Sequence, residues 1–301
     1  MNFNHIWVIR NPVAGWKSLK HVNQMLEILA TGKKRLVVHD TLYSGHAEHL
    51  ALKACKEQAD LLIVAGGDGT LNEVVNGIVV FKRKHKGVIP LLAIFPSGTV
   101  NLVAKELGVT DAPASFTRLI DSEKERVIWP AKVNGRYFLT SVGIGFDAFI
   151  VNNVSSCCKR KFSKLAYIYQ ACRLLAGKWR ERYDISVDGT RYHAAAVIAV
   201  NSHYYAGRFA AVASAALTDQ QVYLCIFTGS SRWDLFTYIL YLLCSRLDKH
   251  KHVIIVGGKR ATVSGSEKRE VQVDGDIAVA LPVRISGGDM PIRILSSENQ
   301  P

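Results

Sequence analysis

Residues 60–80 read DLLIVAGGDGTLNEVVNGIVV, an unbroken apolar run, a turn with three glycines in four positions, and an amphipathic segment. The apolar run predicts a buried strand, and the segment after the turn predicts a helix. Glycines in the turn let backbone N–H groups approach a ligand, and the helix N-terminus adds partial positive charge that favours phosphate. The alternative is a tight turn without a ligand. Asp68 argues against it, because a bare turn does not require a carboxylate between its glycines.

Strand-like and helix-like segments alternate along residues 1–129. Strands are predicted at 5–12, 34–41, 60–67 and 90–96, with helices at 22–30 and 46–58 and after the glycine turn. This alternation predicts a Rossmann-like α/β nucleotide domain, in which helices cover both faces of a parallel sheet. Ligands of such sheets bind beyond the carboxyl ends of the strands.

Two further loops lie where predicted strands end. NPVAG (11–15) closes the first strand, and PSGTVN (96–101) closes the fourth. Each loop alone is a weak signal, because Pro, Gly and Asn are common in turns. Together with the turn at 66–69 they predict one nucleotide site at the carboxyl edge of the sheet.

The sequence changes in character after residue 129. Short alternating segments at 183–200, 221–227, 259–265 and 270–281 predict a C-terminal antiparallel β-sandwich domain over residues 130–301, whose final strand is able to return to the first domain. Two helical insertions, 157–182 and 232–247, interrupt the strands. The second is apolar nearly all round, which predicts burial. A lipid-facing role is the secondary interpretation.

The chain is basic, with 38 Lys+Arg against 25 Asp+Glu and a net charge of +13. Residues 157–182 combine many cations with apolar positions near helical spacing, which suits an anionic membrane surface. A solvated basic face on a packed helix is an equal alternative. Nucleic acid ranks last among the partners, because no nucleic-acid-binding signature accompanies the charge.

Targeting signals are not recognisable in the sequence. The longest strongly apolar run, 235–244, falls short of the ~20 residues that cross a bilayer. The first residues, MNFNHIWVIRNP, lack the pattern of a secretory signal. We therefore expect a cytoplasmic protein, with peripheral attachment at the inner face of the membrane as an option and a homodimer left open.

Five motifs in order, NPVAG, AGGDGTLNEVVNG, PSGTVN, VGIGFDA (142–148) and VQVDGD (271–276), resemble those of the bacterial diacylglycerol kinase-like lipid kinases. Sphingosine and ceramide kinases share this catalytic domain, and the resemblance covers nearly the whole chain. GGDGT alone is less specific, because NAD kinases and some phosphofructokinases carry a similar motif. The segments VGIGFDA and DGD favour the lipid branch.

The resemblance implies an α/β nucleotide domain and a β-sandwich with ATP and Mg²⁺ between them. The glycine turn and the start of its helix would wrap the ATP phosphates. The nucleotide-binding residues that the resemblance implies are Asn11, Thr41, Gly66, Gly67, Asp68, Gly69, Thr70, Leu71, Asn72, Glu73, Gly98 and Thr99.

The resemblance also implies catalytic roles for Asp68, Lys159 and Asp276. Asp276 matches the last carboxylate of the family's DGE motif, the proposed base for the lipid hydroxyl, and is shorter than Glu by one methylene. From the residues alone, 274–276 are read more simply as a type I′ hairpin turn, which Asp-Gly favours.

The resemblance also implies a structural Mg²⁺ site, but the sequence departs from the family pattern there. Asp219 matches its aspartate, with Ala216 and Gln221 as carbonyl ligands. The usual glycine is Gln220, and the usual partner aspartate is Trp129, which cannot ligate a hard cation. Leu102 likewise replaces an aspartate that many members carry after PSGTVN.

The leading hypothesis is an ATP- and Mg²⁺-dependent kinase that phosphorylates the hydroxyl of a diacylglycerol, a sphingoid or a related lipid. An NAD kinase-like soluble enzyme is the second hypothesis. A catalytically silent nucleotide-binding module at the membrane is the third.

Overall fold

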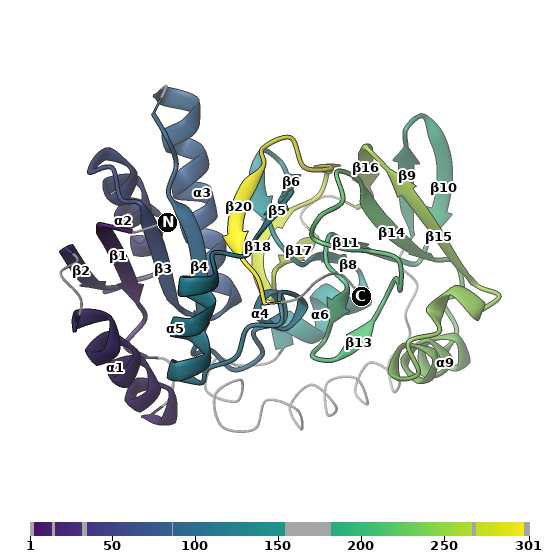
Figure 1. The fold of residues 1–301 in the computed structure, drawn as a ribbon. Helices are drawn as coiled ribbons and strands as arrows, with labels where there is room; N and C mark the ends of the chain where they lie inside the picture. Colours follow the sequence, from purple (N-terminus) through teal and green to yellow (C-terminus); the bar gives the residue numbers. More distant parts are fainter. Residues whose placement is uncertain are drawn as a thin grey trace. The chain divides into compact units, whose positions relative to one another are not determined.

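The computed structural model describes residues 3–13, 16–31, 35–85, 87–153, 182–266 and 269–297, and the chain forms two units (Figure 1). Unit 1 comprises residues 1–129 and 290–301, and unit 2 comprises residues 130–289. Lys159 and residues 157–181 of the basic stretch lie outside the described residues.

Unit 1 is built on a six-stranded sheet in the order β2-β1-β3-β4-β20-β5. Neighbouring strands from β2 to β20 run parallel, and β5 runs antiparallel to β20. β3 and β4 are buried along their whole length, which explains why their sequences are continuously apolar. The strands are β1 (His5–Arg10), β2 (Arg35–Asp40), β3 (Leu61–Gly66), β4 (Leu91–Pro96), β5 (Glu125–Ile128) and β20 (Ile292–Leu295).

Helices form a layer on each face of this sheet (Figure 1). One layer pairs α2 with α3 and the other pairs α1 with α5. Because β1 leads outward to β2 and the chain then returns to β3, right-handed crossovers put α1 and α2 on opposite faces. The helices are α1 (Trp16–Ala30), α2 (His46–Lys56), α3 (Asp68–Lys84), α4 (Leu102–Glu106) and α5 (Pro113–Ser122).

Unit 2 is a sandwich of two antiparallel six-stranded sheets, in the orders β10-β9-β16-β19-β6-β7 and β15-β14-β11-β8-β17-β18. Buried side chains from both sheets form one core. The strands are β6 (Ala131–Val133), β7 (Arg136–Phe138), β8 (Ser141–Ile144), β9 (Tyr183–Val187), β10 (Thr190–Ala194), β11 (Ala196–Val200), β14 (Val222–Phe227), β15 (Val253–Gly258), β16 (Arg260–Ser264), β17 (Glu270–Val273), β18 (Asp276–Ala280) and β19 (Val283–Ser286).

A second core of unit 2 lies on the outer face of the sheet that contains β11. Alternate residues of β11 face the two cores: Val197 and Ala199 lie between the sheets, and Ile198 and Val200 lie in the outer cluster. α9 (Arg232–Leu243) packs on this outer cluster. The remaining elements are α6 (Phe146–Asn153), the 3-10 turn η1 (Leu247–Lys249) and a small ribbon of β12 (Tyr204–Tyr205) and β13 (Phe209–Ala210).

The predicted fold class, an α/β domain followed by an antiparallel β-sandwich, is confirmed. The expected burial of the helix over 232–247 is wrong. Leu235 and Tyr238 are the buried positions of α9, and most of the remaining side chains are exposed. A helix that is apolar all round does not reveal from sequence which of its sides a sheet will cover.

Candidate functional site

A cavity of about 460 Å³ lies in unit 1 beyond the carboxyl ends of the first four strands. Parallel pairing brings these ends to one edge of the sheet. The Thr41 amide donates to the Arg10 carbonyl (2.8 Å), and the Asn11 amide donates to the Ala65 carbonyl (2.9 Å), so the loops leave the sheet side by side. The lining residues are Asn11, Val13, Thr41, Leu42, Tyr43, Ser44, Gly67, Gly69, Thr70, Glu73, Gly98 and Thr99.

The cavity gathers eight of the twelve residues predicted to bind nucleotide, and they come from four separate loops. The other four are Gly66, Asp68, Leu71 and Asn72. Leu71 and Asn72 are buried in α3, where Asn72 accepts a hydrogen bond from the Asn76 side chain (3.1 Å between Nδ2 and Oδ1). The Gly66 carbonyl accepts from the Ser97 amide (3.0 Å). The structure brings the predicted loops together, and the role of each residue in binding stays a prediction.

The loops after β3 and β4 touch through two glycines. A Cβ on Gly98 would lie 2.6 Å from the Cα of Gly67 and 2.7 Å from Oδ1 of Asn101. Side chains at these positions would force the loops apart and occupy the space beside them. Their absence lets backbone amides reach a ligand, as phosphate recognition requires.

Two buried polar atoms beside this contact have no hydrogen-bond partner within the part of the chain that the structure describes: Ser97 Oγ and Asn101 Oδ1. Buried polar atoms usually have partners in folded proteins. The Asn101 amide group is held by the Gly98 carbonyl (2.9 Å), which fixes the side chain in the loop. The Ser97 hydroxyl can donate to a phosphate oxygen of a nucleotide such as ATP, whereas Asn101 Oδ1 only accepts and would need a donor group of a ligand.

Asp68 and Glu73 both have structural partners. The Asp68 carboxylate accepts from the amides of Leu102 (2.9 Å) and Val103 (3.1 Å), at the start of α4. The Glu73 carboxylate accepts from the amides of Gly45 (2.7 Å) and Ala47 (3.1 Å), at the start of α2. Each acid therefore caps a neighbouring helix and ties the glycine turn to another loop of the cavity. Leu102 lacks the expected carboxylate, and its contribution here comes from its backbone.

An ion pair fixes the bases of two of these loops. Arg10 and Asp40 end β1 and β2, and the guanidinium donates to both carboxylate oxygens (2.7 and 2.9 Å). These hydrogen bonds hold the pKa of the Asp40 carboxyl below its usual value. A bidentate pair of this kind restrains the geometry of both strand ends.

Several lining residues were not identified from the sequence. Val13, Leu42 and Tyr43 are exposed apolar or aromatic side chains at the rim, and the Tyr43 ring stacks on His46 with centroids 4.8 Å apart. Their position directly after β1 and β2 was a usable signal, because every strand end of this sheet reaches the same edge. They give the cavity an apolar side as well as a polar one.

In unit 2 the segment 274–276 is the hairpin turn between β17 and β18, with Asp274 and Gly275 in left-handed conformations. The Asp274 carboxylate accepts from the amides of Leu139 (2.8 Å) and Thr140 (2.7 Å), so it anchors the turn. Asp276 begins β18 and is exposed. Position 276 therefore combines a hairpin turn with an exposed carboxylate.

A buried polar cluster supports the same turn, and its central residue, Asp147, is not among the site residues predicted from the sequence. Its carboxylate accepts from the Gln272 side chain (2.9 Å) and from the Tyr205 hydroxyl. Gln272 Oε1 accepts in turn from the Gly275 amide (2.8 Å). Burial raises the pKa of the Asp147 carboxyl, which favours its protonated form. The motif VGIGFDA was the available signal for this residue.

The predicted metal ligands form a tight turn. The Ala216 carbonyl accepts from the Asp219 amide (3.0 Å), and the Asp219 carboxylate accepts from the Ala216 amide (3.2 Å). The Gln221 side chain donates to the Tyr223 hydroxyl (2.7 Å). Among the described residues no three His, Cys, Asp or Glu side chains gather where they could hold a metal, but this does not test a site with two backbone carbonyl ligands. A structural Mg²⁺ at Asp219 stays a prediction.

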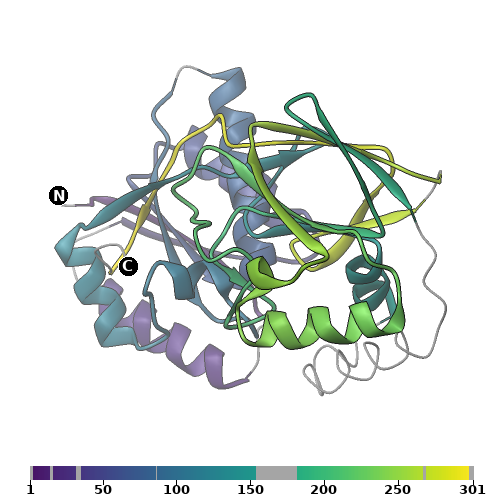
Figure 2. The same cartoon turned by 90° about the vertical axis from the view of Figure 1, so that its right-hand side faces the viewer.

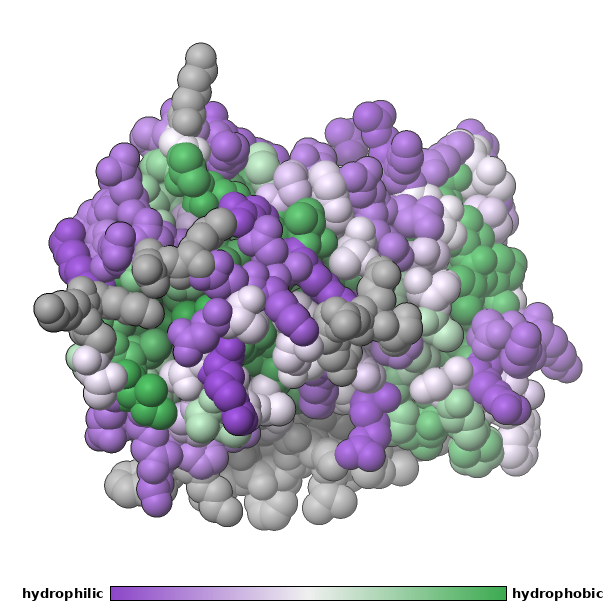
Figure 3. Space-filling view, in the orientation of Figure 1, coloured by the Kyte–Doolittle hydropathy of each residue, from purple (hydrophilic) through white to green (hydrophobic). Residues whose placement is uncertain are grey.

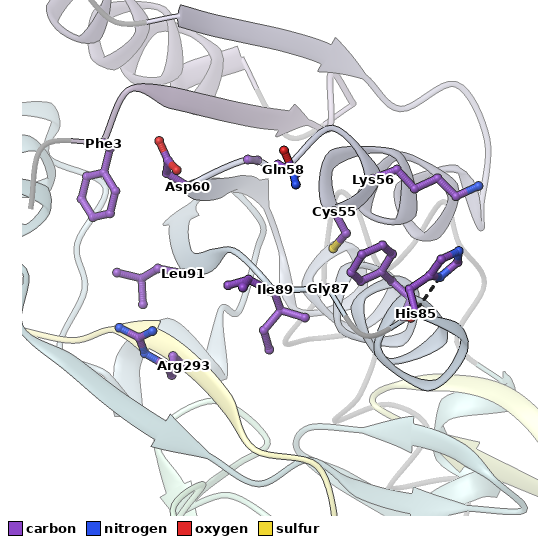
Figure 4. A pocket seen from close by; sticks show the side chains of 13 residues that line it. Phe3, Cys55, Lys56, Gln58, Asp60, His85, Gly87, Ile89, Leu91 and Arg293 are labelled. Carbon is purple, nitrogen blue, oxygen red and sulfur yellow. Dashed lines mark hydrogen bonds between the residues drawn. The ribbon is translucent and has the colours of Figure 1, made fainter.

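A second cavity of unit 1, about 680 Å³, lies at the opposite, amino ends of the strands (Figure 4). It is larger and mainly apolar, and two of its charged groups, Asp60 and Arg293, have partners. The Asp60 carboxylate accepts from the amides of Asn4 and His5 (2.9 Å each), and Arg293 pairs with Glu125 at 2.6 Å. None of the predicted site residues lines it.

The sequence profile of the diacylglycerol kinase catalytic domain matches residues 5–133, and that of the YegS C-terminal NAD kinase beta sandwich-like domain matches residues 140–295. A relative from Bacillus subtilis named diacylglycerol kinase is 28% identical, with 91% of this chain and 90% of the relative covered. The crystal structure of a diacylglycerol kinase from Bacillus anthracis is similar to this fold, with a TM-score of 0.79 and 24% sequence identity. The alignment covers 99% of this chain and 98% of the Bacillus anthracis chain.

The NADH kinase of yeast is a more distant structural neighbour, with a TM-score of 0.54 and 10% identity over 99% of this chain and 85% of that one. This likeness concerns the fold alone. Both halves of the chain match consecutive domains of lipid kinases, and the glycine turn, the cavity and the DGD hairpin lie within those matches. The chain belongs to the diacylglycerol kinase-like lipid kinase family and is a phosphotransferase with an alcohol group as acceptor.

Proposed function

We propose that this protein transfers the γ-phosphate of ATP, with Mg²⁺, to the hydroxyl of a membrane lipid. Diacylglycerol is the first candidate acceptor, because the Bacillus subtilis relative is named for it. Sphingoids and related lipids are the other acceptors to test. The observation that carries the proposal is the cavity in unit 1, where loops from four parallel strands meet around the Gly67–Gly98 contact.

The nucleotide end of the reaction is assigned to this cavity. The glycine turn offers backbone amides and the N-terminus of α3 to the phosphates, and the Thr70 hydroxyl lies 3.3 Å from Nδ2 of Asn11 on the facing loop. The apolar rim at Leu42 and Tyr43 suits the adenine ring. Mg²⁺ bound with ATP would neutralise part of the phosphate charge.

The acceptor end is assigned to Asp276. Its carboxylate accepts the proton of the lipid hydroxyl while the hydroxyl oxygen bonds to the γ-phosphorus of ATP. The bond between that phosphorus and the β–γ bridging oxygen breaks, and ADP leaves with the bridging oxygen. The exposure of Asp276 and the rigid hairpin that holds it support this role. Lys159 is a further catalytic candidate, on the resemblance alone.

The lipid acceptor implies work at a membrane surface, and the net charge of +13 suits an anionic one. The described part of the chain contains no helix that is long and apolar enough to cross a bilayer. Peripheral attachment at the cytoplasmic face is therefore part of the proposal.

The test uses purified protein, Mg²⁺, ATP labelled at the γ-phosphate, and vesicles that carry diacylglycerol, sphingosine or ceramide in separate reactions. We expect label in the organic phase with at least one lipid. Asp276→Asn should lower kcat by about 10²–10⁴-fold, because the general base is lost. Asp184→Asn, an exposed carboxylate of unit 2 that pairs with His193, is the matched control and should keep the wild-type rate.

The other outcomes identify the competing hypotheses. Transfer to NAD in the absence of vesicles would replace the lipid kinase by an NAD kinase-like enzyme. Binding of ATP without transfer to any acceptor would identify a silent nucleotide-binding module. Full activity of Asp276→Asn would remove the general base from the mechanism and leave the cavity assignment standing.

A further inference from the structure

Helix α9 is held firmly on unit 2. Ser231 caps its start, since its hydroxyl accepts from the Asp234 amide (3.0 Å) while the Asp234 carboxylate accepts from the Ser231 amide (3.0 Å). On the inner side Leu235 and Tyr238 are buried in the outer core cluster, and the Tyr238 ring lies 4.7 Å from that of Phe227. The orientation of the helix is therefore fixed, with one side facing the sheet.

Two polar side chains of α9, those of Asp234 and Thr237, form hydrogen bonds with other residues of unit 2. Asp234 Oδ1 lies 2.7 Å from Nδ1 of His252, and Thr237 Oγ1 lies 2.9 Å from Nε2 of His250. A surface helix normally buries its apolar residues and presents its polar residues to water. In α9 this arrangement is partly inverted.

The outward side is an apolar stripe of Trp233, Phe236, Leu240 and Leu243, which follow one another at helical spacing. Trp233 is 77% exposed, Phe236 42%, Leu240 44% and Leu243 50%. The rings of Trp233 and Phe236 meet edge to face, with centroids 6.2 Å apart. Figure 2 shows α9 as a bright green helix at the surface of unit 2. A contiguous exposed apolar patch marks an interaction site more often than chance.

Cations lie at both ends of the stripe. Arg232 is the first residue of α9, and Arg246, Lys249 and Lys251 follow its end, all four exposed. The acids nearby are engaged: Asp234 with Ser231 and His252, and Asp248 with Lys249 at 3.2 Å. Figure 3 shows apolar side chains beside hydrophilic ones over this part of the molecule. Aromatic and aliphatic side chains framed by Arg and Lys match the interface of an anionic bilayer.

We propose that α9 docks this protein onto an anionic lipid surface. The helix lies in the plane of the interface, with its stripe among the headgroups and upper acyl chains and its cations on the lipid phosphates. Its 12 residues would cover about 18 Å, which is too short to cross a bilayer and long enough for the helix to lie flat on its surface. The proposal extends the proposed function by naming the element that meets the membrane. It requires neither ATP nor turnover.

The experiment measures sedimentation of the full-length protein with phosphatidylglycerol/phosphatidylcholine vesicles, without nucleotide. Trp233→Ser/Leu240→Ser should lower the partition coefficient by about tenfold or more, because two apolar anchors are lost. Val127→Ser removes a similarly exposed apolar side chain from β5 in unit 1 and should bind as wild type does. Arg232→Gln/Arg246→Gln should weaken binding to these vesicles and reduce its dependence on salt.

Folding is checked by thermal unfolding, and the two serine substitutions at exposed sites should leave Tm within a few degrees. Wild-type binding by Trp233→Ser/Leu240→Ser would overturn the proposal. A second result would also overturn it: the wild type is a dimer, and the double variant is a monomer that binds vesicles as well as the wild type does. In that case a second copy of the chain covers the stripe. Loss of vesicle binding in the double variant with no kinase activity in the wild type would uphold the docking surface and reject the proposed function.

Discussion

The carboxylate of Asp68 lies 2.9 Å from the backbone nitrogen of Leu102, so the turn after β3 holds the start of the helix after β4. The second carboxylate oxygen accepts from Val103 (3.1 Å). We therefore expect Asp68→Ala to release the start of α4 from the turn after β3. It should cost about 0.5–2 kcal/mol of stability, as loss of a helix cap does, and raise the KM for ATP.

Asp68→Asn separates the two effects, because one oxygen can still accept while the second amide loses its partner. We expect an intermediate Tm and an intermediate KM, measured by thermal unfolding and steady-state kinetics. A loss of kcat in Asp68→Asn with Tm and KM unchanged would assign Asp68 to the chemical step instead of the cap.

Gly98→Ala should disrupt the cavity. The new Cβ would lie 2.6 Å from the Gly67 Cα, which is a steric clash. The two loops would have to move apart to relieve it. We expect ATP to raise Tm far less in this variant than in wild type. Gly69→Ala is the steric control for folding, because its Cβ meets nothing within 4 Å and its helical position favours alanine. An unchanged ATP-induced shift in Gly98→Ala would remove the glycine contact from the site.

Tyr43→Ala should weaken nucleotide binding without affecting the fold. Tyr43 is 59% exposed and lines the cavity, so its loss removes little packing but leaves the rim without an aromatic surface. We expect a several-fold rise in the KM for ATP with kcat nearly constant, the pattern for lost uniform binding. Tyr204→Ala, a substitution in the β12–β13 ribbon of unit 2, is the control.

Asp147→Asn should be at least as stable as wild type at neutral pH. Burial raises the pKa of the Asp147 carboxyl, so its contribution to stability is full at low pH and is lost as pH rises through the folded-state pKa. Asparagine resembles the protonated acid and can still accept from Gln272. Asp147→Ala should instead cost about 1–3 kcal/mol, since it leaves the Gln272 and Tyr205 donors buried without this acceptor. Urea unfolding across the pH range measures both.

His250 should make unit 2 less stable in mild acid. Burial, with the neighbouring His252, lowers the pKa of the His250 ring below 6.5, although Asp234 opposes this shift. The His250 Nδ1 accepts from the His252 amide (3.1 Å), and protonation would end that hydrogen bond. Its contribution is therefore full above about pH 6.5 and is lost as pH falls below that value. We expect Tm to fall in this window, with a smaller slope in His250→Gln and an unchanged slope in His193→Gln.

Much of unit 1 could be predicted from the sequence because its strands are short apolar runs that end in recognisable turns. β3 and β4 were identified for this reason, and the meeting of their loops followed from the geometry of parallel sheets. The capping roles of Asp68 and Glu73 could not be predicted. Their partners lie about thirty residues away in the chain, and only the folded sheet brings them together.

In other parts of the chain the local hydrophobic pattern was too weak or too uniform to predict how an element packs. The sequence left open that the final strand returns to the first domain, but no local periodicity shows that β20, a four-residue strand, pairs with β4 about two hundred residues away. α9 shows apolar residues on every side, so the sequence could not tell its buried side from its exposed one. Asp147 lies within the motif VGIGFDA, but only the structure shows that it is buried between Tyr205 and Gln272.

The insertion of β20 between β4 and β5 has a consequence for biosynthesis. While the ribosome is still making the sandwich, the first 129 residues lack an interior strand of their own sheet, and β4 exposes an unpaired edge. Unit 1 can complete the hydrogen bonding of its sheet only after residues 292–295 emerge. A nascent chain stalled before that point, or one clipped near its end, should remain incompetent for ATP even though every glycine loop has already been translated.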